Sequence, residues 1–258
     1  MPRIIAVANQ KGGVGKTTTS VNVAASLAIG EQAVLLIDLD PQSNATSGLG
    51  LDPKNLSQTV YDCMARGAPI TNVIVPTVVQ KLSIAPANAD LVGAEVELVN
   101  VEGREHTLKN VVSEVANHYD FIILDCPPAL GILTINALVA ASSVLVPVQC
   151  EYYAMEGLGR LMANVRRVQE SLNPSLKLEG IVLTMYDSRN SLSRQVVEEI
   201  RSHFKEKVYK TMIPRNVTLA EAPSYGRPVA LYNAASSGAQ AYLELTKEIL
   251  VYGEEGTR

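Results

Sequence analysis

Residues 11–18 of the sequence, KGGVGKTT, have the composition of a loop that binds phosphate. Glycines reach backbone angles that turn several N–H groups toward one anion, and their lack of side chains lets phosphate oxygens approach closely. We expect the Lys16 amine to reach the β- and γ-phosphates of a nucleotide and the Thr17 hydroxyl to ligate Mg²⁺. The residues assigned to the loop are Lys11, Gly12, Gly13, Val14, Gly15, Lys16, Thr17 and Thr18.

The loop departs at its first position from the common pattern G-x-x-x-x-G-K-[ST]. Counting back from Lys16, the first glycine belongs at position 10, where this sequence has Gln10. A second lysine, Lys11, stands beside it. Two neighbouring cations repel each other unless an anion lies between them, so the extra lysine favours a bound phosphate.

Three aspartates follow hydrophobic runs of strand length: Asp38 and Asp40 in LLIDLD, and Asp125 in FIILD. Ligands of an open α/β sheet lie beyond the carboxyl ends of its strands, so these carboxylates are expected near the loop. Asp125 fits an aspartate that holds Mg²⁺, and Asp40 fits a catalytic residue that orients the attacking water. Asp38 is expected to support the loop structurally. The candidate metal ligands are therefore Thr17, Asp40 and Asp125.

The elements that must position these residues appear as aliphatic runs alternating with segments of helical period. The runs are apolar throughout, which is typical of parallel strands covered on both faces. They span residues 4–8, 33–38, 82–87, 121–125, 143–149 and 180–186. Helical periodicity is clear between Leu158 and Leu172 and between Leu192 and Phe204. We predict an α/β fold in which one domain, residues 1–258, has a mainly parallel, twisted sheet with helices on both faces.

The overall composition limits the possible function classes. A net charge of −4 over 258 residues argues against a chain covered in basic charge for nucleic acid. The opening MPRIIAVANQ lacks the features of a signal peptide, and no apolar run approaches the roughly 20 residues of a membrane span. Cys63, Cys126 and Cys150 are odd in number and form no C-x-x-C pair, so we expect buried thiols in a reducing cytoplasm.

Five segments together resemble one family: KGGVGKTTT, DLDPQSNATSGLG, DCPPALG, PVQCEYYAMEGL and IPRNVTLAEAPSYGRP. They closely resemble the ParA/Soj chromosome-partitioning ATPases, and the resemblance runs from about residue 3 to residue 250. The glycine loop alone indicates only the wider deviant-Walker group of P-loop NTPases. The resemblance implies a cytoplasmic, nucleoid-associated enzyme that hydrolyses ATP with Mg²⁺ as cofactor.

The family comparison gives the second lysine a role. It implies that Lys11 is a catalytic signature lysine that crosses a dimer interface to the phosphate of the other subunit, with Gly12 at the seam. The physical principle is that of a cation supplied in trans to the transferring phosphoryl group. Glu151 and Tyr152 resemble interface residues near the nucleotide. The segment that resembles the lining of the adenine pocket is Pro214, Arg215 and Asn216.

The resemblance also implies three partners: an ATP-dependent homodimer, nonspecific double-stranded DNA, and a ParB-type centromere-binding protein that stimulates hydrolysis. Residues 187–227 hold eight basic and five acidic side chains, an excess of +3 that suits phosphate contacts. Two segments lack basic residues common in relatives, at Thr218 and in 233–239. The candidate DNA contacts are Arg189, Arg194, Arg201, Lys205 and Arg215.

Two other ATPase classes share the glycine loop. A membrane-surface positioning ATPase of the MinD type needs a basic amphipathic C-terminal helix. Residues 239–258 hold two basic and four acidic side chains, so we expect no membrane anchor and a last helix docked on the domain. An electron-transfer ATPase like the nitrogenase iron protein needs cluster cysteines, and Cys126 and Cys150 do not match those positions. A positioning ATPase for another cargo, chromosomal or not, would have the same motifs.

Overall fold

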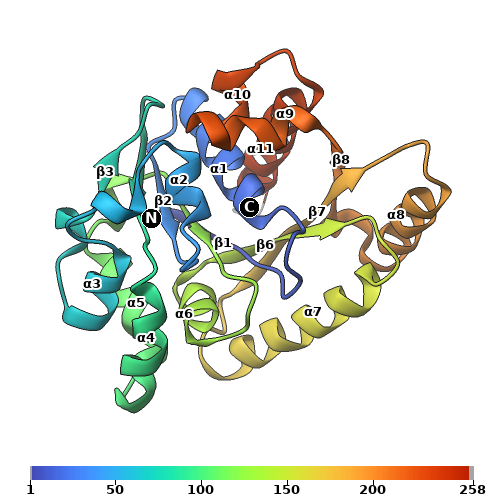
Figure 1. Ribbon diagram of the computed structural model, residues 1–258. Helices are drawn as coiled ribbons and strands as arrows, with labels where there is room; N and C mark the ends of the chain where they lie inside the picture. Colours follow the sequence, from blue (N-terminus) through green and yellow to red (C-terminus); the bar gives the residue numbers. More distant parts are fainter. Residues whose placement is uncertain (1, 256–258) are drawn as a thin grey trace.

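One eight-stranded sheet organises residues 2–255, the part of the chain that the computed structural model describes. Its strand order is β3-β4-β2-β5-β1-β6-β7-β8, and every neighbouring pair is parallel except β3 and β4 (Figure 1). The strands are β1 (Arg3–Val7), β2 (Val34–Asp38), β3 (Val75–Pro76), β4 (Leu82–Ala85), β5 (Phe121–Asp125), β6 (Ser143–Gln149), β7 (Lys177–Tyr186) and β8 (Val208–Pro214).

Helices cover both faces of the sheet, and each face has its own hydrophobic core. In Figure 1, α1, α9, α10 and α11 lie together over one face, while α6 and α7 lie on the other. The helices are α1 (Lys16–Ile29), α2 (Asn44–Gly48), α3 (Val60–Arg66), α4 (Leu91–Glu97), α5 (Thr107–Ser113), α6 (Ile132–Ala140), α7 (Ala154–Ser171), α8 (Ser191–Phe204), α9 (Val217–Glu221), α10 (Val229–Tyr232) and α11 (Ser237–Glu255).

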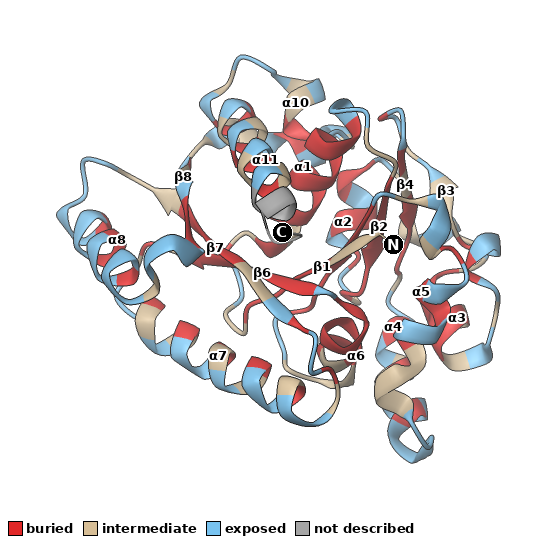
Figure 2. Cartoon of the chain, turned by 180° about the vertical axis from the view of Figure 1, so that it is seen from behind, coloured by how far each residue is buried: buried red, intermediate tan, exposed pale blue. Residues whose placement is uncertain are grey.

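The predicted α/β class is confirmed: the sheet is mainly parallel and lies between two helical layers. All residues of β2 and β5 are buried, as expected for uniformly apolar strands covered on both faces (Figure 2). Burial of each aliphatic side chain contributes about 1.5–3 kcal/mol, so these runs supply much of the driving force for folding. The two segments with helical periodicity form α7 and α8.

Two strands were not predicted, and both lie at edges of the sheet. β8 has the sequence VYKTMIP, in which Lys210 is exposed and Thr211 only partly buried, so the run is not uniformly apolar. β3 has only two residues, too few for any periodicity. Edge strands are covered on fewer sides than central ones, and their sequences therefore carry a weaker hydrophobic signal.

The last helix docks on the domain, as its apolar positions predicted. Ala239, Leu245 and Ile249 of α11 are fully buried, and the Tyr242 hydroxyl lies 3.1 Å from that of Thr19 on α1. Residues 256–258, which entered the predicted C-terminal charge balance, lie outside the described part of the chain. Among the helices of residues 2–255, none is long and apolar enough to cross a membrane.

Candidate functional site

The carboxyl ends of three strands meet where α1 begins. β1 ends at Val7, a loop follows, and α1 starts at Lys16. In the register of the sheet, Val7 and Asp38 both lie opposite Asp125. Strand ends that are distant in sequence thus come together at one edge of the sheet, where open α/β sheets bind their ligands.

The glycine loop has a backbone that depends on its glycines. Gly13 and Gly15 have φ angles of 73° and 86°, in the left-handed region that other residues rarely adopt. No atom lies within 4 Å of a Cβ built on Gly12 or on Gly13. The loop therefore leaves open space beside its backbone, which is what close approach of an anion requires.

Two side chains outside the loop hold it in place. Asn9 accepts a hydrogen bond from the Lys11 N–H at 3.0 Å and donates one to the Pro147 carbonyl at 2.7 Å. The Thr184 hydroxyl donates to the Val14 carbonyl at 2.8 Å. The loop is thereby tied to β6 and β7. Neither side chain was predicted from the sequence. Thr184 lies near the carboxyl end of a predicted strand, which is where ligand sites of open α/β sheets occur, so its position was a usable signal.

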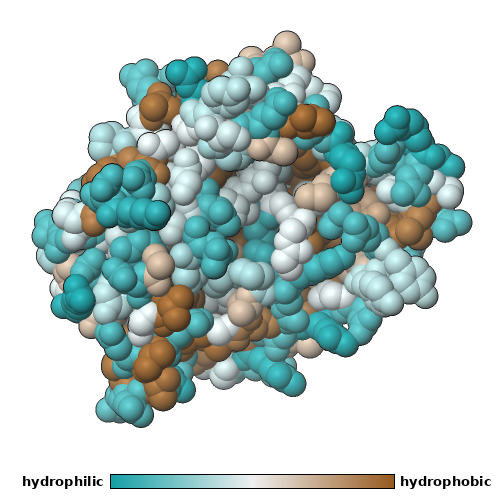
Figure 3. All heavy atoms as spheres, in the orientation of Figure 1, coloured by the Kyte–Doolittle hydropathy of each residue, from teal (hydrophilic) through white to brown (hydrophobic). Residues whose placement is uncertain are grey.

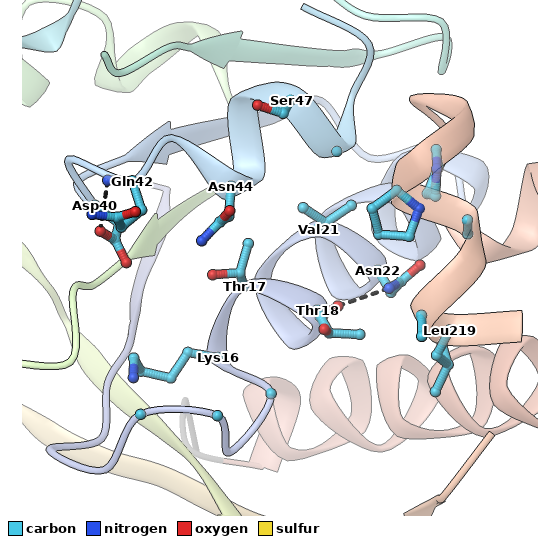
Figure 4. A pocket seen from close by; sticks show the side chains of 18 of the residues that line it. Lys16, Thr17, Thr18, Val21, Asn22, Asp40, Gln42, Asn44, Ser47 and Leu219 are labelled. Carbon is cyan, nitrogen blue, oxygen red and sulfur yellow. Dashed lines mark hydrogen bonds between the residues drawn. The ribbon is translucent and has the colours of Figure 1, made fainter. Parts of the chain in front are cut away.

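Lys16 is buried inside the curve of the loop, with 7% of its surface exposed (Figure 4). Its amine donates to the Lys11 carbonyl at 3.1 Å. Burial lowers the pKa of this amine, while the nearby carboxyl groups of Asp125 and Asp40 act to raise it. A desolvated cation with one backbone acceptor is ready to bind an anion, because charge-assisted hydrogen bonds are strong where water is excluded.

Asp38 holds the segment 40–46 by hydrogen bonds, rather than the glycine loop that it was expected to support. Its carboxylate is fully buried and accepts hydrogen bonds from the N–H and the hydroxyl of Thr46, at 2.9 and 2.7 Å. It also accepts the Asp40 N–H at 3.1 Å. The Thr46 hydroxyl in turn accepts the Ala87 N–H at 3.0 Å. Asp38 thus fixes the chain on either side of Asp40.

Asp125 is fully buried, and only one of its carboxylate oxygens is satisfied. The Ser20 hydroxyl donates to its Oδ1 at 2.7 Å, whereas its Oδ2 has no hydrogen-bond partner. Burial first, and then the charge of Asp38, raise the pKa of this carboxyl to about 8. The hydroxyl of Thr17, which lies beside the same carboxylate, acts in the opposite direction on that pKa.

These residues fit a magnesium ion held together with a nucleotide. Within residues 2–255, no cluster of three His, Cys, Asp or Glu side chains could hold a metal on its own. Mg²⁺ bound with a nucleotide needs no such cluster, because it takes one or two protein ligands, phosphate oxygens and waters. The unpartnered Oδ2 of Asp125 and the adjacent Thr17 hydroxyl supply oxygen ligands of that kind.

Raising the pH is expected to destabilise the metal-free protein through Asp125. The carboxyl has a pKa of 3.8 in the unfolded chain and about 8 in the folded one, so the folded state binds more protons between these values. Its stabilising contribution is full below the unfolded pKa and is lost as the pH rises through about 8. We expect the urea midpoint, measured in EDTA, to fall between about pH 7 and about pH 9.

Asp125→Asn is the matched control for this titration, since an amide cannot lose the proton. Burial raises the pKa of Asp38 to about 6, so this carboxyl has lost most of its protons before the pH reaches about 7. The variant is therefore expected to lose most of the wild-type fall in midpoint. If the urea midpoint fell equally with pH in wild type and in Asp125→Asn, the raised pKa of Asp125 would be contradicted.

A cavity of about 560 Å³ opens between the glycine loop, Asp40 and the first turns of α1. The Asp40 carboxylate is 7% exposed, and its Oδ1 accepts the Gln42 N–H at 2.9 Å. Figure 4 shows Lys16, Thr17 and Asp40 around one side of this cavity and Leu219 on the other. All three polar groups thus reach the same space, which is roomy enough for a triphosphate.

A second cavity, of about 360 Å³, adjoins the first along the loop. Gly15, Thr18 and other residues line both cavities. Pro214, Arg215 and Asn216, predicted to line an adenine pocket, form part of the wall of the second one. Residues of this wall that sequence reasoning missed are Met185, Ile213, Val217 and Tyr242. The two cavities together offer a polar space for phosphates and a less polar one for a base.

The Lys11 side chain forms an ion pair within its own chain. Its amine lies 2.8 Å from the Glu151 carboxylate, and both side chains are a little under half exposed. Glu151 was predicted near the nucleotide, and neither it nor Lys11 lines the two cavities described above. Next to Glu151, the rings of Tyr152 and Tyr153 are 74% and 65% exposed. The surface that the family comparison assigns to a dimer interface is therefore exposed to solvent in the single chain.

The predicted DNA contacts lie in and around α8. Arg189 lies two residues before this helix and Lys205 directly follows it, while Arg194 and Arg201 lie within it, about 10 Å apart at 1.5 Å per residue. Arg215 lines the second nucleotide cavity, and its charge also acts on the carboxylate that pairs with Arg189.

The arginines at the start of α8 have local hydrogen-bond partners. The guanidinium of Arg189 is bidentate to Asp187, at 3.0 and 2.8 Å, and lowers the pKa of that carboxyl to about 2. The Arg194 guanidinium donates to the Ser188 carbonyl at 2.6 Å. Both arginines remain exposed. A phosphate that binds Arg189 must compete with the carboxylate of Asp187.

Comparisons with known proteins agree over nearly the whole chain. A family model described as an AAA domain matches residues 2–178. The sporulation initiation inhibitor protein Soj of Bacillus subtilis is 54% identical over 253 residues, which cover 98% of this chain and 100% of that protein. The chromosome partitioning protein ParA of Myxococcus xanthus is 52% identical, covering 96% of this chain and 88% of that protein. A crystal structure named as cobyrinic acid a,c-diamide synthase from Mycobacterium smegmatis, with bound ADP and magnesium, has a TM-score of 0.87 and 39% identity, covering 99% of this chain and 97% of that one.

Proposed function

The chain belongs to the ParA/Soj family of chromosome-partitioning ATPases, and we propose that it is an ATP-controlled dimer that binds DNA without sequence preference. ATP joins two copies into the DNA-binding form. Hydrolysis, stimulated by a ParB-type centromere-binding protein, separates the copies and releases the DNA. The observation that carries this proposal is a half-exposed second lysine, Lys11, at the rim of a glycine loop whose other lysine, Lys16, is buried.

Within one subunit, the proposed roles follow the geometry of the two cavities. The Lys16 amine and the loop N–H groups bind the β- and γ-phosphates of ATP. Thr17 and Asp125 hold Mg²⁺, which supplies charge neutralisation at the phosphates when bound. Asp40 orients the attacking water and contributes to the metal site. The wall formed by Pro214, Arg215 and Asn216 receives the adenine base.

Between subunits, the proposed contact is Lys11 to the triphosphate of the partner copy. In the single chain, the Lys11 amine has one carboxylate partner, Glu151, in a solvent-exposed pair that is worth about 0–1 kcal/mol. A triphosphate carries several charges in a site that dimerisation shields from water, so it competes well for this amine. Gly12 has open space around it and permits the close approach of a second backbone.

DNA binding is proposed through basic side chains of residues 187–227, and dimerisation doubles their number in one particle. Each neutralised phosphate adds to affinity and to its salt dependence, so two weak patches together bind far better than one. Arg194 and Arg201, two turns apart in α8, then contact neighbouring phosphates of the duplex, which suits a binding mode that reads no bases.

Retention of bulk duplex DNA with ATP, with ADP and without nucleotide tests the proposal. We expect retention only with ATP, falling steeply as salt rises. Equal retention with ADP would contradict nucleotide control. Liposomes of anionic lipid, run beside the DNA, test the alternative of a MinD-like membrane-surface ATPase. We expect α11 not to insert into them, because its apolar residues Ala239, Leu245 and Ile249 are buried in the domain.

The synthase name of the M. smegmatis structure does not lead us to a different proposal. Identity to that chain is 39%, whereas identity to Soj and to ParA is 54% and 52%. That name therefore adds support for a site that binds ADP and magnesium, and the reaction is assigned from the more similar relatives.

A further inference from the structure

The short helix α4 and the 3₁₀ turn η3 (Leu98–Asn100) are apolar on both of their sides. Leu91, Ala94 and Leu98 face the core and are buried. Val92 and Val96, one helical turn apart, face outward with 53% and 70% of their surface exposed. Two glutamates also belong to this helix, so its outer side combines exposed valines with carboxylates.

The exposed valines form a patch rather than isolated positions. Val99 and Val101, which follow on directly, are 54% and 48% exposed. Figure 3 shows hydrophobic residues gathered over α4, on the same face of the molecule as the central hollow of the nucleotide site. Single exposed aliphatic residues are ordinary on protein surfaces, whereas a gathered patch marks a site of interaction. We call Val92, Val96, Val99 and Val101 the valine patch.

The surroundings of the valine patch are acidic. Residues 89–106 contain five acidic side chains and one basic side chain, a net charge of −4, which equals the net charge of all 258 residues. Within residues 2–255, Glu95 and Glu102 have neither a hydrogen bond nor an ion pair at their carboxylates. Unpaired carboxylates beside exposed valines complement a partner that is both basic and apolar, and they disfavour an acidic one.

The valine patch is linked to the nucleotide site through Glu95. Its carboxylate lies over Gly131, 2.5 Å from the point where a Cβ of that residue would stand. Gly131 ends the loop 126–131, which follows Asp125 directly. A ligand that moves the Glu95 side chain therefore acts on the loop that follows a candidate magnesium ligand.

We propose that the valine patch is the docking site for a basic amphipathic segment of a partner protein. The apolar side of that segment covers the patch, and its lysines or arginines pair with Glu95 and Glu102. This is helix-in-groove recognition with charge selecting the partner. The proposal rests on the proposed function in one respect only: docking changes the rate of ATP hydrolysis through the loop 126–131.

A labelled synthetic peptide of leucines and lysines, arranged as an amphipathic helix, serves as the probe for binding. Fluorescence anisotropy is measured without nucleotide and at low salt. We expect Val92→Ser/Val96→Ser to weaken binding of the peptide by about tenfold, because two apolar contacts are lost. The matched control Val78→Ser/Val251→Ser alters two valines that are equally exposed elsewhere, at 61% and 56%, and is expected to bind like wild type.

Glu95→Gln/Glu102→Gln tests the electrostatic contribution to peptide binding. This variant is expected to bind the peptide more weakly and with a smaller dependence on salt concentration. Equal binding by Val92→Ser/Val96→Ser and wild type, at matched melting temperature, would overturn the proposal. Equally tight binding of a leucine–glutamate peptide would overturn it as well. Self-association of the wild type that Val92→Ser/Val96→Ser abolishes would assign the patch to a second copy instead.

The same variants are then assayed for DNA retention with ATP. The peptide assay contains neither nucleotide nor DNA, so its result is independent of DNA retention. Variants that bind the peptide like wild type and retain DNA normally with ATP refute only the docking site. Docking that persists in a protein without ATP-dependent DNA binding refutes only the proposed function.

Discussion

Lys16→Ala is expected to weaken binding of a nonhydrolysable ATP analogue by about 100-fold, because the only buried lysine amine at the loop is lost. The amine is held in the loop by one hydrogen bond to the Lys11 carbonyl, so it gives up little when it binds phosphate. Truncating one partner of a desolvated charge pair typically costs about 2–5 kcal/mol. Isothermal titration with the magnesium complex of the analogue measures the loss directly.

Lys11→Ala is the matched control, since it removes a lysine only five positions away that lines neither cavity. We expect this variant to bind the analogue within a few-fold of wild type as a monomer. Melting temperatures of both variants establish that each is folded. Wild-type affinity in Lys16→Ala would refute the role assigned to the buried amine.

Asp40→Ala is expected to slow ATP hydrolysis by about 100-fold while leaving ATP binding intact, so that an ATP-bound dimer accumulates. Positioning a nucleophile or moving its proton typically contributes 10²–10⁴ in rate. The Asp40 carboxylate borders the larger cavity, and the Gln42 N–H is its hydrogen-bond donor. Thr17 and Asp125 remain to hold the metal. Phosphate release gives the rate, and gel filtration in ATP gives the oligomeric state.

Two further variants separate catalysis from assembly and from folding. Asp40→Ala/Lys11→Ala is expected to stay monomeric in ATP, because the proposed contact in trans is lost. Asp38→Ala is expected to lower the melting temperature instead, since it leaves two Thr46 donors without their buried acceptor. A monomeric Asp40→Ala protein at saturating ATP would count against the dimer mechanism.

The central strands and the phosphate loop were predictable because their signals are local. β2 and β5 are uniformly apolar since both faces are covered, and each ends in an aspartate. The glycines of the loop are required by backbone angles that a sequence can reveal. These features depend on adjacent residues, and the structure agrees with the elements that they predicted.

The features that escaped prediction depend on contacts between distant segments. Asn9 binds Pro147 across 138 positions, and Thr184 binds Val14 across 170. No periodicity or motif encodes such pairs. The ion pair of Lys11 with Glu151 is of the same kind, since the family comparison placed both residues near a seam without joining them within one chain. The approach of Arg215 to the carboxylate that pairs with Arg189 is likewise a contact between segments distant in sequence.

The strand order has a consequence for how this protein is made. The first strand, β1, pairs only with β5 and β6, which begin at Phe121 and Ser143. The helix that follows it packs on α11, through the contact of Thr19 with Tyr242. During translation, the glycine-rich segment therefore leaves the ribosome early and waits, without its neighbours, for most of the chain to be synthesised. Because Tyr242 of α11 contacts Thr19 and lines the second cavity, we expect chains that end before this helix to contain the loop motif and to bind nucleotide poorly.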